Sequence, residues 1–176
     1  MPGARGLVVG FYVGFACCCF GLDVHLESAG VRFGFSPIGA GRDFHQAEAF
    51  VNWNLPWMWD LGSLWRLQSR VEVSAGWIED SGVNAGLVAV GPNFSLNRRG
   101  SRLSFDCGIS PTVLTRSNFP SKDFGIPFEF TSHGGLSFEI SSRIRLSYRF
   151  QHMSNAGLGL HNPGLNLNMF GISYVF

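Results

Sequence analysis

Alternation of charged and apolar side chains is the feature that most constrains the fold of this chain. In residues 143–150, RIRLSYRF, the even positions are Ile, Leu, Tyr and Phe, and the odd positions are Arg, Arg, Ser and Arg. Successive side chains of a β-strand point to opposite faces, so this segment is predicted to be a strand with one apolar and one charged face. Residues 126–140 and 65–78 alternate in a similar way.

The charged faces hold more arginine and glutamate than the core of a soluble protein accommodates. A small barrel in a membrane resolves the conflict, because its interior is polar while its outer wall meets lipid. We therefore expect His133 and His45 to face the interior. We expect an interior ion-pair network made of Arg66, Arg70, Glu72, Glu129, Glu139, Arg145 and Arg149.

The composition agrees with a wall that faces lipid. Charged residues make up 14% of the chain, against about 25% in soluble domains, and aromatic residues make up another 14%. A lipocalin-like soluble carrier is the alternative barrel, but its exterior needs more charge than this. The net charge of +1 gives no reason to expect a nucleic-acid partner.

We predict an all-β fold, an eight-stranded antiparallel transmembrane β-barrel that occupies residues 23–176. Trp53, Trp57, Trp59 and Trp65 gather near one turn and Trp77 lies far from it, as expected for two interfacial aromatic girdles. The strands are expected at residues 27–36, 44–55, 65–78, 83–96, 101–115, 126–140, 143–154 and 166–176.

Residues 1–22 are predicted to be a signal peptide, with Arg5 followed by a short apolar stretch. An N-terminal anchor helix and a lipoprotein signal at Cys17 are the alternatives. Three of the four cysteines lie in this segment, which leaves Cys107 without an internal disulfide partner. No cysteine–histidine spacing suggests a metal site, and no cofactor is expected.

A candidate site lies in QHMSNAGLGLHNPGLN, residues 151–166. Continued alternation turns Gln151 inward and His152 and Ser154 outward, about 6.5–7 Å apart along the strand. Asn166 begins the next strand with the same outward parity. A serine becomes a nucleophile when a base removes its proton, histidine has a suitable pKa, and a third group fixes the histidine tautomer.

The turn that joins these two strands is the candidate source of oxyanion or substrate-binding donors. It contains Asn155, Gly157 and Asn162, which offer backbone N–H groups and side-chain amides. In the outer loops, His161, Lys122, Arg116 and Arg42 are expected either to be solvated or to contact a substrate headgroup and its phosphates.

The segment HMSNAGLGLHNPGLN with its final strand resembles the signature of the PagL-type lipid A 3-O-deacylases. The resemblance implies an eight-stranded barrel of the bacterial outer membrane with a site on its exterior wall. It implies that His152 is the base and Ser154 the nucleophile, and it makes Asn155 and Asn162 oxyanion candidates. The acid position, a glutamate in the best-known members, falls on Asn166.

The expected function is therefore hydrolysis of the 3-linked acyl ester of lipid A, the membrane anchor of lipopolysaccharide, by a Ser-His-Asn variant triad. The C-terminal hairpin would carry the active site, and a homodimer is an option. The alternative is a non-catalytic small barrel that binds lipopolysaccharide or has a structural or adhesive role.

Overall fold

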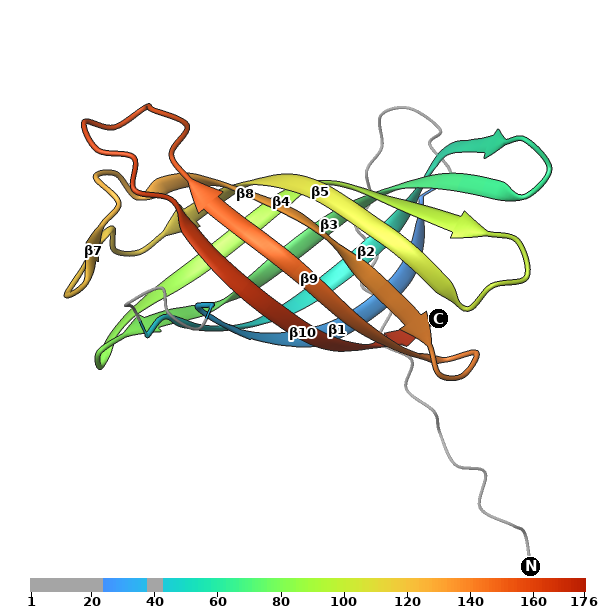
Figure 1. Ribbon diagram of the computed structural model, residues 1–176, viewed down its shortest axis with the longest axis horizontal. Helices are drawn as coiled ribbons and strands as arrows, with labels where there is room; N and C mark the ends of the chain where they lie inside the picture. The colour runs from blue at the N-terminus through green and yellow to red at the C-terminus, as the bar shows by residue number, and fades with distance from the viewer. Residues whose placement is uncertain (1–23, 38–42) are drawn as a thin grey trace, which may run out of the picture.

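The computed structural model describes residues 24–37 and 43–176. The predicted signal peptide and Arg42 lie outside the described residues. Eight long strands form a closed barrel, and two short ones form a separate hairpin (Figure 1). The barrel strands are β1 (His25–Phe35), β2 (His45–Leu61), β3 (Trp65–Asp80), β4 (Val83–Arg98), β5 (Leu103–Leu114), β8 (Phe128–Glu139), β9 (Ile144–Ser154) and β10 (Leu165–Val175). The hairpin strands are β6 (Asn118–Phe119) and β7 (Lys122–Asp123).

The predicted fold is confirmed. The strands follow one another around the barrel in the order β1-β10-β9-β8-β5-β4-β3-β2, and every neighbouring pair is antiparallel. Pairing of β1 with β10, from Ser28 opposite Val175 to Phe35 opposite Asn168, closes the sheet. Closure leaves no exposed sheet edge. A sheet can lie in hydrocarbon only when every strand is paired on both sides. Among the described residues, no helix has the length and hydrophobicity required to span a bilayer.

One predicted turn is wrong. Residues 56–61 were expected to follow the second strand as a connection, but β2 continues to Leu61. The register shifts between Asn54 and Met58, and pairing then resumes from Met58 opposite Gln68 to Leu61 opposite Trp65. A bulge of this kind interrupts the alternation without ending the strand, so the sequence pattern shows a break that the backbone does not have.

The outer wall of the barrel is an apolar belt. Large side chains with 40–60% of their surface exposed come from several barrel strands, among them Val31, Phe33, Val88, Phe105, Ile109, Leu136, Phe138, Leu146, Phe150, Phe170 and Ile172. Trp77 is exposed near one end of β3, while Trp57, Trp59 and Trp65 are exposed near the other. This is the surface of a transmembrane barrel with aromatic residues at both interfaces.

The middle of the interior is an ion-pair ring. Arg32 contacts Glu48 at 3.1 Å and Glu72 at 2.9 Å, and Arg149 contacts the same two carboxylates at 2.7 and 3.0 Å. All four side chains are buried. His133 lines the adjoining cavity with Glu72 and Arg149, as expected from its parity.

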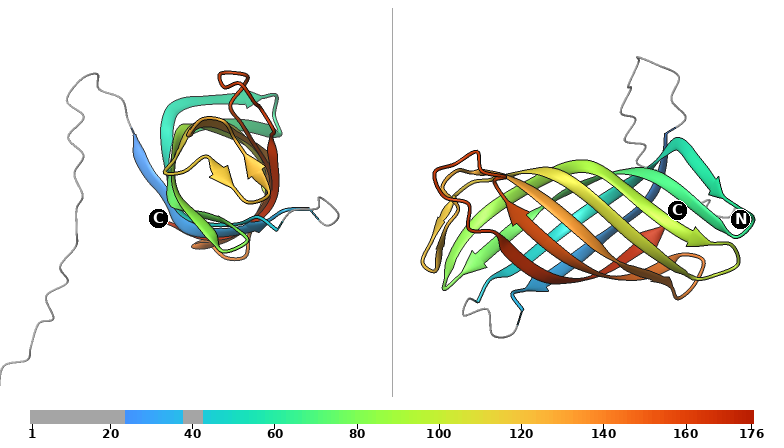
Figure 2. Two further views of the ribbon diagram at one scale, coloured as in Figure 1. Left: turned by 90° about the vertical axis from the view of Figure 1, so that its left-hand side faces the viewer. Right: turned by 45° about the horizontal axis from the view of Figure 1, so that its top comes forward.

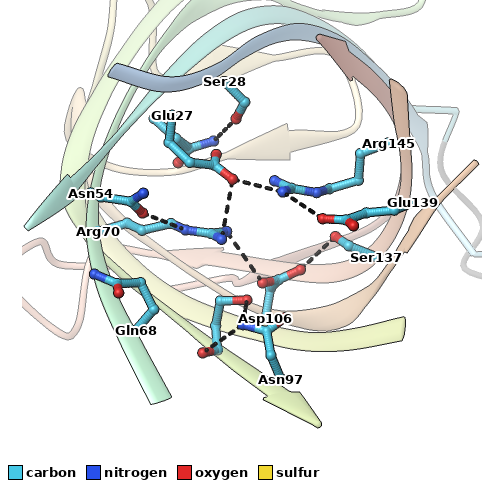
Figure 3. Close-up of polar contacts among 12 residues, drawn as sticks. Glu27, Ser28, Asn54, Gln68, Arg70, Asn97, Asp106, Ser137, Glu139 and Arg145 are labelled. Atoms are coloured by element: carbon cyan, nitrogen blue, oxygen red, sulfur yellow. Dashed lines mark hydrogen bonds and ion pairs between the residues drawn. The ribbon is translucent and has the colours of Figure 1, made fainter. Parts of the chain in front are cut away.

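A second interior cluster lies nearer to the C-terminus, and Figure 3 shows its contacts. Glu27 forms ion pairs with Arg70 at 3.2 Å and with Arg145 at 2.7 Å, and Arg70 also approaches Asp106 at 3.7 Å. Ser137 donates a hydrogen bond to Asp106. Every charged group in this cluster meets an opposite charge, so the cost of taking these ions out of water is offset by their attraction.

Some predicted members of the network lie elsewhere. Arg66 pairs with exposed Asp60 at the end of the β2–β3 hairpin, beyond the bulge. Glu139 reaches Arg145 at 3.2 Å but is half exposed at a strand end. Glu129 is fully buried, but its carboxylate has no hydrogen-bond partner in the described part of the chain. His45 faces outward, where its ring stacks on Phe33.

At the end of the barrel opposite Phe176, here called the cap end, the interior contains an apolar cluster. Residues 115–127, here called the cap, include the β6–β7 hairpin, which lies within the outline of the barrel when viewed along its axis (Figure 2). Phe119 and Phe124 from the cap pack edge to face with one another and with Phe44. The same cluster contains Ile78, Ala85, Leu87, Leu114, Met153, Leu165, Leu167 and Met169.

Candidate active site

The candidate site is built on the last residues of β9 and the first residues of β10. Asn166 pairs with His152 in the antiparallel register. Both side chains are exposed on the outer wall, whereas Gln151 and Met153 are fully buried inside. The predicted outward orientation of His152 is confirmed, and it follows from the same alternation that places the arginines of β9 inside.

His152 and Asn166 contact each other through their side chains. Nδ1 of His152 lies 2.7 Å from Oδ1 of Asn166. An amide oxygen only accepts hydrogen bonds, so Nδ1 carries the proton and donates a hydrogen bond to Oδ1 of Asn166. The neutral imidazole then has its lone pair on Nε2, the tautomer that a general base requires.

Ser154 follows on the same outward face and is half-buried. Its position in β9 is opposite Phe130 of β8, and Ser132 of β8 is opposite His152. In the described residues, no hydrogen bond joins the Ser154 hydroxyl to the imidazole. The two side chains share a face two residues apart, a spacing of about 6.5–7 Å between their backbone positions.

Residues 155–164, here called the site loop, begin with a tight turn. Leu158 donates its N–H to the carbonyl of Asn155 at 3.0 Å, and the two central residues, Ala156 and Gly157, have φ of 54° and 81°. Two successive positive φ values define a type I′ geometry. A non-glycine residue seldom adopts this conformation, which is found preferentially at functional sites.

The Asn155 side chain holds the turn together. Its Nδ2 donates to the carbonyls of Phe124 at 2.8 Å and His161 at 2.6 Å, and its Oδ1 accepts from the N–H of Gly157 at 2.9 Å. The N–H of Asn155 donates to Oδ1 of Asn162 at 3.0 Å. The three oxyanion candidates are therefore brought together, but both Asn155 amide protons and the Gly157 N–H are already engaged.

The cap contributes a residue whose place differs from the sequence expectation. Lys122 was expected in a solvated loop or near substrate phosphates, but its side chain is buried. Its Nζ donates to the carbonyl of Pro163 at 2.7 Å and also to that of Gly164. These partners are 41 and 42 residues away along the chain, so no local pattern could have paired them.

The fold and the outer wall define the class: this is a small transmembrane β-barrel with a polar cluster on its lipid-facing side. The family within that class follows from sequence. A family model described as lipid A 3-O-deacylase (PagL) matches residues 45–175. This chain belongs to that family.

Individual relatives agree with this assignment. The chain is 31% identical over 138 residues to the lipid A deacylase PagL of Bordetella bronchiseptica, which covers 75% of this chain and 78% of the relative. Its fold resembles the crystal structure of the outer membrane enzyme PagL, with a TM-score of 0.72, 17% identity, and coverage of 83% of this chain and 97% of that one. The N-terminal barrel of Pseudomonas aeruginosa OprF matches less well, with a TM-score of 0.53, 13% identity, and coverage of 85% and 98%.

Proposed function

We propose that this protein is an outer-membrane lipid A 3-O-deacylase in which Ser154, His152 and Asn166 carry out the hydrolysis. The observation that carries the proposal is the 2.7 Å contact between His152 and Asn166 beside Ser154, on the lipid-facing wall of a chain of this family. A polar group that faces hydrocarbon is costly and is therefore commonly functional.

The position of the site suits a substrate embedded in the outer leaflet. Both ends of the barrel wall meet an interface, and the site lies at the cap end, opposite the C-terminus. With the C-terminus on the periplasmic side, the cap end reaches the cell surface, where lipopolysaccharide lies. The acyl chains of the substrate would lie along the apolar wall, which places the ester at the level of the strand ends.

The reaction starts when His152 Nε2 removes the proton of the Ser154 hydroxyl as Oγ attacks the ester carbonyl. The tetrahedral intermediate collapses with cleavage of the bond between the acyl carbon and the sugar oxygen. The imidazolium returns its proton to that oxygen, which leaves as a free hydroxyl. A water molecule then attacks the acyl-serine with the same base, and the fatty acid departs.

Asn166 supports this reaction by holding the imidazole rather than by supplying charge. Its amide oxygen fixes the tautomer, but it is neutral and stabilises the imidazolium less than a carboxylate would. In serine proteases the exchange of the triad aspartate for asparagine costs about 10⁴ in turnover, because the wrong tautomer is held. Here the oxygen of Asn166 faces Nδ1, so the favourable tautomer is retained.

Donors for the oxyanion are proposed to come from the site loop. The side-chain nitrogen of Asn162 is the best candidate, since its oxygen is fixed by the Asn155 N–H while its nitrogen has no hydrogen-bond partner among the described residues. Asn155 and Gly157 then contribute the shape of the turn that presents Asn162 beside Ser154. Preorganised donors of this kind stabilise the charge that develops on the carbonyl oxygen.

The test is mass spectrometry of lipid A from cells that express the wild type, Ser154→Ala or His152→Ala at equal levels in the outer membrane. We expect loss of one 3-linked hydroxyacyl chain in the wild type only. Tyr148→Phe is the matched control, because it removes another outward hydroxyl from the same strand and should keep activity. Unmodified lipid A with the wild type, under conditions where the barrel is folded, would favour the non-catalytic alternative.

Asn166→Glu sharpens the assignment of the third residue. A carboxylate at this position would accept from Nδ1 and also stabilise the imidazolium, so the turnover should rise. Asn166→Leu removes the acceptor and should lower it. An unchanged rate in both variants would remove Asn166 from the triad. The homodimer stays a prediction, to be tested by light scattering of the folded barrel in detergent.

A further inference from the structure

The cap is joined to the site loop through a buried ammonium group. Lys122 is the first residue of β7, and its Nζ binds the carbonyls of Pro163 and Gly164, which immediately precede β10. Charge-assisted hydrogen bonds are roughly twice as strong as neutral ones. A charge that is buried on folding requires such partners, so the ammonium and the two carbonyls fix one another.

The backbone that Lys122 holds is in contact with His152. A Cβ added to Gly164 would overlap Cε1 of the imidazole and lie 3.1 Å from Nε2. The Gly164 backbone therefore packs directly against the Cε1–Nε2 edge of the ring, while Asn166 binds the ring at Nδ1. Contacts on two sides define where Nε2 points, and Gly164 supplies one of them.

Lys122 is itself held by the barrel. The neighbouring Ser121 donates its N–H and its hydroxyl to Oδ2 of buried Asp80, both at 2.8 Å. The ammonium also lies 5.7 Å from the centre of the Phe124 ring, within the range of a cation–π contact. Phe124 belongs to the apolar core at the cap end. A continuous series of contacts thus runs from the barrel interior through Lys122 to the base on the outer wall.

We propose that Lys122 is a positioning residue for the catalytic histidine. It fixes the Pro163–Gly164 backbone against the imidazole and so keeps Nε2 directed toward Ser154. The inference rests on the proposed function, because it assigns His152 as the base. Loss of a solvated loop lysine would leave the position of the imidazole unchanged. Loss of a lysine that binds substrate phosphate would change KM instead.

Lys122→Met tests this by removing the ammonium while keeping an unbranched side chain. With purified, folded enzyme and lipid A in mixed micelles, we expect kcat to fall ~10–100-fold, as a displacement of about 1 Å in a reacting group can cause. KM should change by less than about twofold, the pattern of an interaction that acts on turnover. Lys122→Arg should restore most of kcat, and Asn118→Ala, an exposed change in the same hairpin, should leave kcat unchanged.

Gly164→Ala is an independent route to the same displacement, and it applies even if Lys122→Met fails to fold. The added methyl group must displace the imidazole, so kcat should fall in this variant too. The double variant should lose less than the product of the two single losses, because both act on one contact. Wild-type kcat in folded Lys122→Met, or in folded Gly164→Ala, would overturn the inference.

A measurement without substrate separates this inference from the proposed function. In ¹⁵N-histidine NMR spectra, the His152 Nδ1–H bound to Asn166 should be visible in the wild type and broadened in Lys122→Met. Activity that survives Ser154→Ala would refute the catalytic assignment and leave this spectral effect standing. Inactive Ser154→Ala and His152→Ala combined with an unchanged His152 signal in Lys122→Met would refute the positioning role alone.

Discussion

The two faces of β9 carry polar groups under opposite conditions. On the inner face, Arg149 contacts Glu48, Glu72 and Gln151, at distances of 2.7–3.0 Å. On the outer face, the side chain of His152 is hydrogen-bonded to that of Asn166. Inside, each charged side chain of the central ring is paired with an opposite charge on another strand, so these charges stabilise the fold. Outside, the imidazole that we propose as the base lies on the same face as the Ser154 hydroxyl, an arrangement that suits the proposed chemistry.

The difference shows how one strand serves both purposes. Charges of the inner face bind partners on distant strands and so connect β9 to the opposite side of the barrel. Near the cap end, the interior contains an apolar cluster in which Met153, Leu165 and Leu167 pack directly behind the proposed site. Alternation then places the residues of the proposed site between these core residues.

The largest expected effect comes from breaking the inner face. Arg149→Met leaves Glu48 and Glu72 buried with half of their counter-charge removed, and it should destabilise the barrel by about 3–5 kcal/mol. Urea unfolding in detergent micelles measures this. Deacylation per folded molecule should stay at the wild-type level, because the change is on the other face of the strand. Arg66→Ala, at an exposed pair, is the control and should cost at most ~1 kcal/mol.

The next effect lies where the two faces meet, in the site loop. Asn155→Ala removes the donors to the carbonyls of Phe124 and His161 and the acceptor for Gly157, and should destabilise the protein by about 1–3 kcal/mol. Activity should fall as well, since the loop also holds Asn162. Unfolding curves and lipid A mass spectra measure the two effects. A variant with wild-type turnover would show that the site does not depend on the turn.

A smaller effect is expected from an outward polar pair that lies away from the triad. Tyr148 donates to Oδ1 of Asn168 at 2.9 Å on the outer wall. Tyr148→Phe loses this bond and should destabilise the barrel by about 0.5–1.5 kcal/mol with little change in turnover. If turnover instead dropped as far as in Ser154→Ala, the outer polar cluster would extend beyond His152, Ser154 and Asn166.

Alternation was sufficient to predict most of the barrel and the face of the site. The alternation pattern was ambiguous wherever apolar residues face the barrel interior. The predicted inward orientation of His45 is wrong, because the even positions from Phe44 to Phe50 are the ones that face inward. In the structure Phe50 lies 3.7 Å beneath the guanidinium of Arg32, and Phe44 belongs to the cap-end core. A barrel with a partly apolar interior weakens the contrast on which the prediction depends.

The cap could not be predicted for a different reason. Lys122 is in a polar stretch, and its sequence context is that of a solvated loop. Its burial depends on carbonyls that come from the other outer loop, and on the aromatic cluster beneath it. Contacts of this kind are set by how two loops meet in space, and neither loop has a pattern of its own. The residues of the proposed site could be named from the sequence, whereas the contacts that Lys122 makes beneath them could not.

The smallest expected effect concerns the strained residue next to the site. Ala156 has φ of 54°, which costs an alanine about 1–2 kcal/mol relative to a glycine. Glycine also gains freedom in the unfolded chain, which costs about 0.4–1 kcal/mol, so Ala156→Gly should stabilise the protein by only ~0.5 kcal/mol. Turnover distinguishes two roles for this residue. If the alanine serves only to complete the turn, turnover is unchanged. If its strain holds the backbone after Ser154 in one conformation, the glycine variant will be slightly more stable and will turn over more slowly. In that case the outer face of the barrel is less stable than it could be in favour of activity, whereas the inner face is not.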